Sequence, residues 1–201
     1  MRFGIIGAGA IGQALARHIV KAGYPVTLSN SRGPQTLTDV VADIGPLSSA
    51  GTVHQAAEAD IVFLATYWAV APDVLDALPN WNDRILVDTT NALEIVGDTL
   101  VPIDTGDRTG SEIIAAHAPG ARVIKAFNTL YAEYIAADPR HEAGRQVIFL
   151  AGDDADAKAA VGSLIDEFGF VPVDIGTLHE GGRLMEVNGG PLSGLHLLKQ
   201  N

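Results

Sequence analysis

The chain has 201 residues, a formal net charge of −11 and no cysteine. This length suits one domain, and a composition of 47% apolar and 18% charged residues suits a well-buried core. The acidic balance argues against a nucleic-acid footprint or an anionic membrane surface, and no run approaches the roughly 18 apolar residues that span a bilayer. Without cysteine there is no disulfide, thiolate nucleophile or thiolate metal site. A cytoplasmic location is expected, because the first residues are typical of a strand and not of a secretory signal.

The N-terminal residues predict a dinucleotide-binding turn. Residues 2–6 have the length of one buried parallel strand, and residues 13–22 have helical spacing. Between them, Gly7 allows a tight turn, Gly9 lets the backbone approach a pyrophosphate, and Gly12 lets the helix pack on the sheet. The helix N-terminus would hold that pyrophosphate. The alternative is a glycine-rich turn used only for packing.

The end of the second expected strand, residues 25–29, indicates which dinucleotide binds. NAD-binding proteins usually place an acid there for the ribose 2′-hydroxyl, but this chain has no acid between residues 21 and 38. Instead, Asn30 and Ser31 can donate hydrogen bonds and Arg32 can hold a phosphate bidentately. NADP is therefore preferred over NAD, the alternative being a polar loop with a solvated arginine.

Strand and helix patterns alternate along the rest of the chain and predict an α/β fold, a doubly wound parallel sheet of the Rossmann type. We expect a single domain over 1–201, with 176–201 as a small helical extension. Residues 92–107 form the loosest stretch, and 138–145 form a charged surface loop. The expected strands are 47–50, 60–66, 84–88, 121–125, 146–151 and 170–174. One helix is expected to begin near Pro34, and others are expected over 71–78, 111–117, 130–137 and 156–168.

Ligands of open parallel sheets bind beyond the carboxyl ends of the strands. The segments 67–70, 89–91 and 126–129 are therefore expected around the nicotinamide. Asn91 and Asn128 are amides that can fix a carboxamide but do not carry protons near neutral pH.

The side chains near the expected site offer no clear acid or base. Tyr67 and Trp68 fit either a lid beside the cofactor or core aromatics. Lys125 fits either a group that acts on a carbonyl or a solvent-facing lysine, and His179 with Glu180 fits either a substrate contact or the surface. We therefore expect no catalytic residue and no metal site, which suits hydride transfer between two bound cofactors.

Six segments, taken in order, resemble NADPH-dependent F420 reductases and the cytosolic reductase domain of STEAP-type metalloreductases. The resemblance runs from residue 1 to about residue 195. It is carried by residues 7–12, 29–32, 123–129, 152–154, 174–176 and 182–186.

This resemblance implies a flavin-like pocket beside the NADP site. It places the pyrophosphate over residues 8–11, the 2′-phosphate on Ser31 and Arg32 with Asn30, and the nicotinamide near Ala126, whose small side chain lets a second ring stack. The membrane segments of the metalloreductases are missing, and the glycine-rich residues 189–191 differ from F420 reductases, so the electron partner stays open. The candidate cofactor-binding residues are Gly7, Ala8, Gly9, Ala10, Ile11, Gly12, Asn30, Ser31, Arg32, Ala65, Thr66, Tyr67, Val70, Asn91 and Ala126.

The leading hypothesis is an NADP-dependent oxidoreductase that moves a hydride between NADPH and a deazaflavin or flavin: F420, FMN or FAD. One alternative is a reductase of a small carbonyl or imine, of the β-hydroxyacid or pyrroline-carboxylate type, although only residues 175–201 remain for a substrate domain. Another is a non-catalytic NADP(H) sensor. The apolar residues of 182–198 (Leu184, Val187, Leu192, Leu195 and Leu197) would complete the acceptor pocket or cover a homodimer face.

Overall fold

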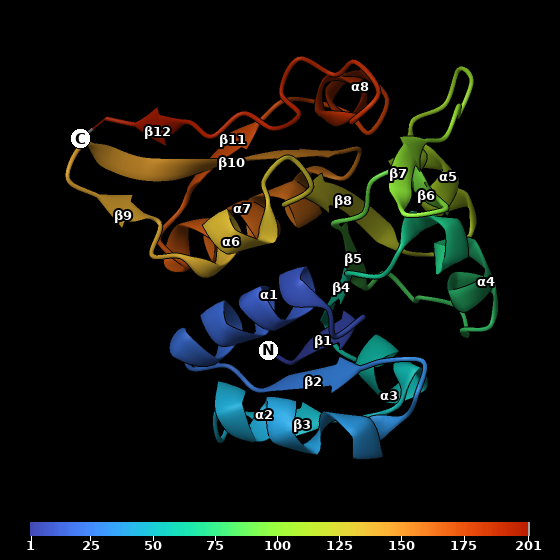
Figure 1. The fold of residues 1–201 in the computed structure, drawn as a ribbon, viewed down its shortest axis with the longest axis vertical. Helices are drawn as coiled ribbons and strands as arrows, with labels where there is room; N and C mark the ends of the chain where they lie inside the picture. Colours follow the sequence, from blue (N-terminus) through green and yellow to red (C-terminus); the bar gives the residue numbers. More distant parts are fainter. Residues whose placement is uncertain (201) are drawn as a thin grey trace.

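A ten-stranded sheet organises the computed structural model, which describes residues 1–200 (Figure 1). Its main path runs in the order β11-β10-β8-β5-β4-β1-β2-β3, and two short strands, β9 and β12, also pair with β10. The strands are β1 (Phe3–Ile6), β2 (Val26–Ser29), β3 (Ser48–Ala50), β4 (Ile61–Leu64), β5 (Ile85–Asp88), β8 (Arg122–Ala126), β9 (Arg140–His141), β10 (Gly144–Gly152), β11 (Val171–Asp174) and β12 (Leu198–Lys199).

The strands from β3 to β8 are parallel, which confirms the predicted doubly wound α/β fold. The expectation of a fully parallel sheet is wrong at β10, which runs antiparallel to β8 with Leu150 opposite Ala126. After β8 the chain forms the short helix α6 (Ala132–Ala136) and β9, and then re-enters the sheet in the opposite direction. An antiparallel strand starts at the same end of the sheet at which the previous strand stops, so the chain needs no helical crossover back to the opposite end. The connection through α6 and β9 is therefore sufficient to join β8 to β10.

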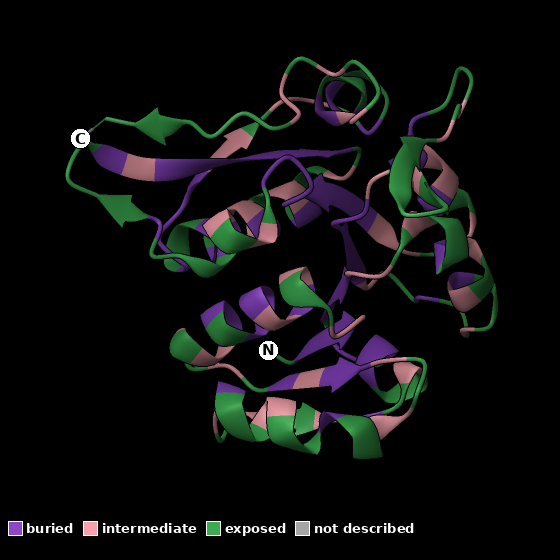
Figure 2. Ribbon diagram, in the orientation of Figure 1, coloured by how far each residue is buried: buried purple, intermediate pink, exposed green. Residues whose placement is uncertain are grey.

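Helices cover both faces of the sheet, and the side chains of the central strands alternate between two cores. On one face Ile5 and Phe63 pack with Leu15, and on the other Val62 and Leu86 belong to a separate cluster. Figure 2 shows these strands as buried along their length. The helices are α1 (Ala10–Lys21), α2 (Thr38–Ile44), α3 (Val53–Ala57), α4 (Ala71–Asp76), α5 (Gly110–Ala116), α6, α7 (Ala155–Glu167) and α8 (Glu180–Met185), with 3₁₀ turns at Pro34–Leu37 (η1) and Trp68–Val70 (η2).

Helix α1 buries one ionisable residue among its apolar side chains. Leu15 and Ile19 are fully buried at helical spacing, and His18 lies beside them with 6% of its surface exposed. The ring of His18 stacks against Phe168, and its Nε2 lies 2.6 Å from the carbonyl oxygen of Ile135. Burial, partly offset by this carbonyl, holds the pKa of His18 below its usual value. The helix therefore packs around a neutral imidazole.

The stretch expected to be loosest contains an antiparallel hairpin, β6 (Leu93–Val96) and β7 (Thr99–Pro102). Figure 2 shows the hairpin as largely exposed. It pairs outside the main sheet, with Ile95 opposite Leu100. Gly97, with φ of 62°, begins the two-residue turn, so the Gly97-Asp98 pair between alternating apolar residues is the sequence signal that reveals it.

The C-terminal extension packs on the same sheet. Met185, at the end of α8, is fully buried in a small cluster with Phe149 and Val171, while β12 pairs with the outer part of β10. The predicted helical extension is thus α8, followed by turns over 187–194 and the short strand β12.

Candidate nucleotide-binding cleft

The last residues of four parallel strands and the next-to-last residue of a fifth, β8, stand side by side along one edge of the sheet. By register, Ser29, Ile6 and Leu64 are successive neighbours, and Asp88 and Lys125 continue the row. The loops that follow β1, β2, β4 and β5 open into a cleft of about 820 Å³. This is the carboxyl edge at which parallel sheets bind ligands.

The turn after β1 contains glycines for two different reasons. A Cβ at Gly7 would lie 2.3 Å from the carbonyl oxygen of Ala65, and one at Gly12 would lie 2.0 Å from that of Gly7. These two positions are closed by the protein itself. A Cβ at Gly9 would meet no protein atom within 4 Å, so the space above Gly9 is open for a ligand.

Helix α1 begins at this open position without a cap from its own sequence. Gly9 is its N-cap residue, no side chain bonds the first turn, and no acidic residue lies in that turn. The free N–H groups and the positive end of the helix dipole therefore face the cleft, where they suit an anion. Together with the space above Gly9, they fit the pyrophosphate of a dinucleotide.

The loop after β2 presents Ser31 and Arg32 to the cleft. Both residues are exposed and line it. Asn30 also lines the cleft, but its amide bonds the loop itself: Oδ1 accepts from the Arg32 N–H at 3.0 Å, and Nδ2 donates to Thr36 at 2.9 Å. The first role of Asn30 is therefore to shape the loop that carries Ser31 and Arg32. No carboxylate lines the cleft in the described part of the chain, so nothing opposes a 2′-phosphate here.

The structure brings together all the predicted site residues except Gly12 and Ala126. Gly12 packs α1 on β1. Ala126 is fully buried in the core with Ile124 and Phe127, so its side chain offers no surface for a nicotinamide ring. The cleft lining is Ile6 to Ile11, Asn30 to Arg32, Val53, Ala65 to Trp68, Val70, Val74, Thr89 to Asn91, Leu93, Leu100 and Ala132.

An apolar wall lines the cleft on the side of β4 and β5, whereas Arg32 follows β2 on the other side of β1. It consists of Tyr67, Val70, Leu93 and Leu100, all of which line the cleft. Tyr67 is 63% exposed and Leu100 is 53% exposed, so both are open to a ligand. The sequence predicted Tyr67 and Val70 here, but it missed the two leucines because the hairpin that carries them was expected to be a loop.

The amide of Asn91 is held on the same side of the cleft. Its Nδ2 donates to the carbonyl oxygen of Asn128 at 3.0 Å, and its Oδ1 accepts from Asn128 Nδ2 at 2.9 Å. Asn128 in turn donates to the carbonyl oxygen of Met185. Within residues 1–200, no further bond involves the second N–H or the second lone pair of the Asn91 amide, and this pair of groups is complementary to a carboxamide.

Neither of the two other candidate groups reaches the cleft. Lys125 does not point to solvent and does not line the cleft; it is buried against Asp88, with 3.2 Å between Nζ and Oδ2. His179 lies 3.1 Å from Glu112, whose carboxylate also caps α5 through the N–H of Thr109. Although burial alone raises the pKa of Glu112, Thr109 and His179 outweigh it and hold that pKa below its usual value.

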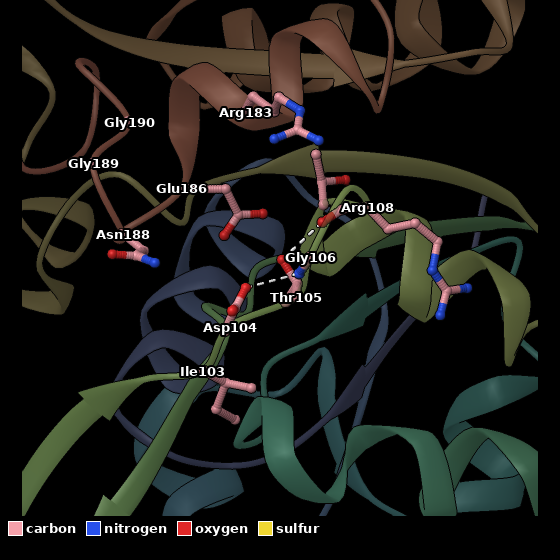
Figure 3. Close-up of a pocket in the computed structure, with 11 residues that line it drawn as sticks. Ile103, Asp104, Thr105, Gly106, Arg108, Arg183, Glu186, Asn188, Gly189 and Gly190 are labelled. Carbon is pink, nitrogen blue, oxygen red and sulfur yellow. Dashed lines mark hydrogen bonds between the residues drawn. The ribbon is translucent and has the colours of Figure 1, made fainter.

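A smaller hollow of about 280 Å³ lies between the end of the hairpin and α8 (Figure 3). Arg183 and Glu186 from the α8 side face Asp104 and Thr105 across it. These polar groups mostly hold the fold: Glu186 accepts from the N–H of Gly110 at 2.8 Å, and Arg183 donates to the carbonyl oxygen of Asp107. The indole N–H of Trp68, which lines the cleft, donates to the carbonyl oxygen of Gly110.

Within residues 1–200, no group of three or more His, Cys, Asp or Glu side chains is placed to hold a metal ion. None of the helices in that range has the length and apolar character needed to cross a bilayer.

The apolar tail does not cover the cleft. Of its five apolar residues, Leu192 packs against the cluster around Met185, while Leu184, Leu195 and Leu197 are about 40% exposed. Whether these leucines cover a homodimer face stays a prediction.

Comparison with known proteins identifies relatives. The family model for "NADP oxidoreductase coenzyme F420-dependent" matches residues 2–92. Metalloreductase STEAP3 of Rattus norvegicus is 28% identical over 177 residues, which is 88% of this chain but 34% of that protein. This chain thus spans about a third of that relative.

Two solved structures resemble the whole fold. The hypothetical protein SMa0349 from Sinorhizobium meliloti is 41% identical, with a TM-score of 0.92 over 100% of this chain and 96% of that one. A putative F420-dependent NADP-reductase from Arthrobacter sp. FB24 is 24% identical, with a TM-score of 0.74 over 89% of this chain and 86% of that one. At this lower identity the likeness shows the fold.

Proposed function

Residues 2–92 match the NADP oxidoreductase family described as coenzyme F420-dependent, and from this premise we propose that the chain transfers a hydride between NADPH and a bound deazaflavin or flavin. NADPH supplies the hydride in this chemistry. The protein's own part is to hold the two rings together and to keep water out.

Three features of the cleft support the orientation of NADPH. The open space above Gly9 and the uncapped start of α1 suit the pyrophosphate. Arg32, after β2, suits the 2′-phosphate. Thr89 to Asn91 follow β5, which lies on the opposite side of β1 from β2. With the 2′-phosphate near β2, the nicotinamide would reach the amide of Asn91.

The observation that carries the choice of acceptor is the character of the nicotinamide end. Its wall is apolar, and the described cleft lining contains only Arg32 and Tyr67 as ionisable side chains. An apolar wall suits an aromatic ring that stacks on nicotinamide. Hydride transfer between two rings needs positioning and no proton donor from the protein.

Tyr67 supports the second candidate, a reductase of a small carbonyl or imine. Such a substrate needs a proton as well as a hydride, and the Tyr67 hydroxyl is the one proton carrier that lines this end of the described cleft. The Tyr67→Phe variant separates the two functions. Flavin or deazaflavin reduction keeps most of its rate, because the ring remains, whereas carbonyl or imine reduction falls by about 100-fold or more.

The decisive experiment measures NADPH oxidation, without oxygen, against F420, FMN, FAD, a small ketone and a cyclic imine. We expect turnover with F420 or a flavin. Turnover only with the ketone or imine would support the second candidate. Tight NADPH binding without turnover on any acceptor would support an NADP(H) sensor.

The hairpin provides a matched pair of variants for the same assay. Leu100→Asp places a charge on the apolar wall and should raise KM for the ring acceptor by about tenfold, while leaving NADPH affinity unchanged. Val96→Asp is its control, because Val96 is 56% exposed, projects from the other face of the hairpin and does not line the cleft. Equal effects of both variants would contradict a specific role for the wall.

A further inference from the structure

Directly behind the nicotinamide end lies a fully buried ion pair, Asp88 and Lys125. Their side chains are 0% and 1% exposed. They end β5 and approach the end of β8, and the register of the two parallel strands makes them direct neighbours. Every other described ion pair is more exposed than this one. In each of them either one partner is more than half exposed, or both partners are about a third exposed or more.

Most of the hydrogen bonds of this pair converge on one residue, Thr90. Asp88 Oδ1 accepts from the N–H of Thr90 at 2.9 Å and from its hydroxyl at 2.6 Å. The ammonium of Lys125 donates to the carbonyl oxygen of the same residue. Asp88 Oδ2 accepts from Ser111 at 2.6 Å as well as from Lys125. The pair therefore holds the donor and acceptor groups of a residue that belongs to no helix or strand.

The held segment is the floor of the cleft. Thr89, Thr90 and Asn91 all line it. Thr89 is itself fixed by two bonds to the carbonyl oxygen of Leu64, one from its N–H and one from its hydroxyl. Asn91 is fixed by its exchange of bonds with Asn128. Any shift of Thr90 would move the amide of Asn91 that faces the nicotinamide end.

Stability alone does not account for such a pair. Removing two charges from water costs free energy that their attraction often fails to recover, and apolar residues of similar size are frequently as stable. A pair that bonds three groups of one cleft-lining residue does something apolar residues cannot do. It fixes the position of a loop.

We propose that Asp88 and Lys125 are positioning residues that set the geometry of the nicotinamide carboxamide through Thr90 and Asn91. The proposal rests on the proposed binding of NADPH in this cleft, but not on which acceptor is used. Neither residue touches the cofactor, and the effect passes through the loop.

The test uses two ligands that differ only at the nicotinamide end. NADPH carries the ring, and 2′-phospho-ADP-ribose has the same adenine, 2′-phosphate and pyrophosphate without it. The variants are Lys125→Met and the double variant Asp88→Asn with Lys125→Met. The double variant leaves no unpaired buried charge and is therefore measured where the single variant does not fold. The control is Lys158→Met, which removes the partly exposed pair of Lys158 with Asp174.

In the double variant we expect NADPH affinity to fall by about fivefold to tenfold, as for the loss of a hydrogen bond or two, with the affinity of 2′-phospho-ADP-ribose unchanged. The rate of a single hydride transfer should fall further, by about 100-fold, because a small misplacement of the ring is costly. Lys158→Met should change none of these values. Equal losses for the two ligands, or no loss for either, would overturn the positioning role. If the unmodified protein bound neither ligand, the proposed function itself would fail.

Discussion

A pair of glycine substitutions in the first turn tests whether the cleft holds a pyrophosphate. At Gly9, φ is −76° and ψ is −170°, which alanine adopts without strain, and the added Cβ meets no protein atom within 4 Å. Gly9→Ala should therefore leave the free energy of unfolding unchanged or raise it by about 0.4–1 kcal/mol, because alanine restricts the unfolded chain. At Gly12 the same Cβ would lie 2.0 Å from the carbonyl oxygen of Gly7 and 3.1 Å from the side chain of Ile5. Gly12→Ala should cost about 1–3 kcal/mol of stability, since α1 must move away from β1.

The effects on cofactor binding should not follow the effects on stability. Gly9→Ala, the variant that keeps its stability, should be the one that loses NADPH affinity. In Gly9→Ala the methyl group occupies the space of the pyrophosphate, and the loss of charged hydrogen bonds worth about 1.5–3 kcal/mol weakens NADPH by roughly 10- to 150-fold. Chemical denaturation gives the stability, and titration calorimetry gives the affinity. A Gly9→Ala protein that binds NADPH as tightly as the unmodified chain would refute the assignment of the turn. A Gly9→Ala protein that is destabilised as much as the Gly12→Ala protein would refute the packing argument.

Three more outcomes follow from the structure. Arg32→Ala should weaken NADPH by about 1.5–3 kcal/mol and barely change NADH, with Arg17→Ala as the control outside the cleft; an equal loss for both cofactors would contradict the phosphate contact. Because the pKa of His18 is lowered on folding, the unfolded chain binds the proton more tightly, so stability should fall as the pH drops below about 6.5, with a slope of up to about 1.4 kcal/mol per pH unit. His18→Gln should flatten that slope in denaturation curves measured at several pH values. Ala126→Leu should lower the free energy of unfolding by about 1–3 kcal/mol, because its side chain is in the core; a stable variant with impaired turnover would return Ala126 to the cleft.

The sequence was sufficient for the parts of the site that depend on local chemistry. The three glycines after a strand pattern, and the absence of an acid after the second strand, predicted the two parts of the cleft at which we propose that the phosphates bind. Each of these signals lies within a few neighbouring residues. Arg32 also follows its strand directly, so no knowledge of distant contacts was needed to place it at the carboxyl edge.

The parts that the sequence missed depend on contacts between distant residues. The hairpin that carries Leu93 and Leu100 has only two four-residue strands, and such a ribbon is marginal without neighbours. The sequence predicts that Ala126 follows a strand, as Arg32 does, but in the structure Ala126 is the last residue of β8, and the antiparallel strand β10 pairs beside it and helps to enclose it in the core. The direction of β10 was not visible in the local pattern, so the exposure of Ala126 was not predictable.

The buried pair shows why long-range register matters for this site. Asp88 and Lys125 are 37 residues apart, and each stands at the end of an ordinary apolar strand. Only the pairing of β5 with β8 brings the two charges together. A slip of one residue would turn Lys125 to the opposite face of the sheet and leave Asp88 buried without its cation, an arrangement that costs about 3–5 kcal/mol when one partner of a buried pair is lost. The same two charges that hold Thr90 in the cleft therefore also select the register of the strands that build it.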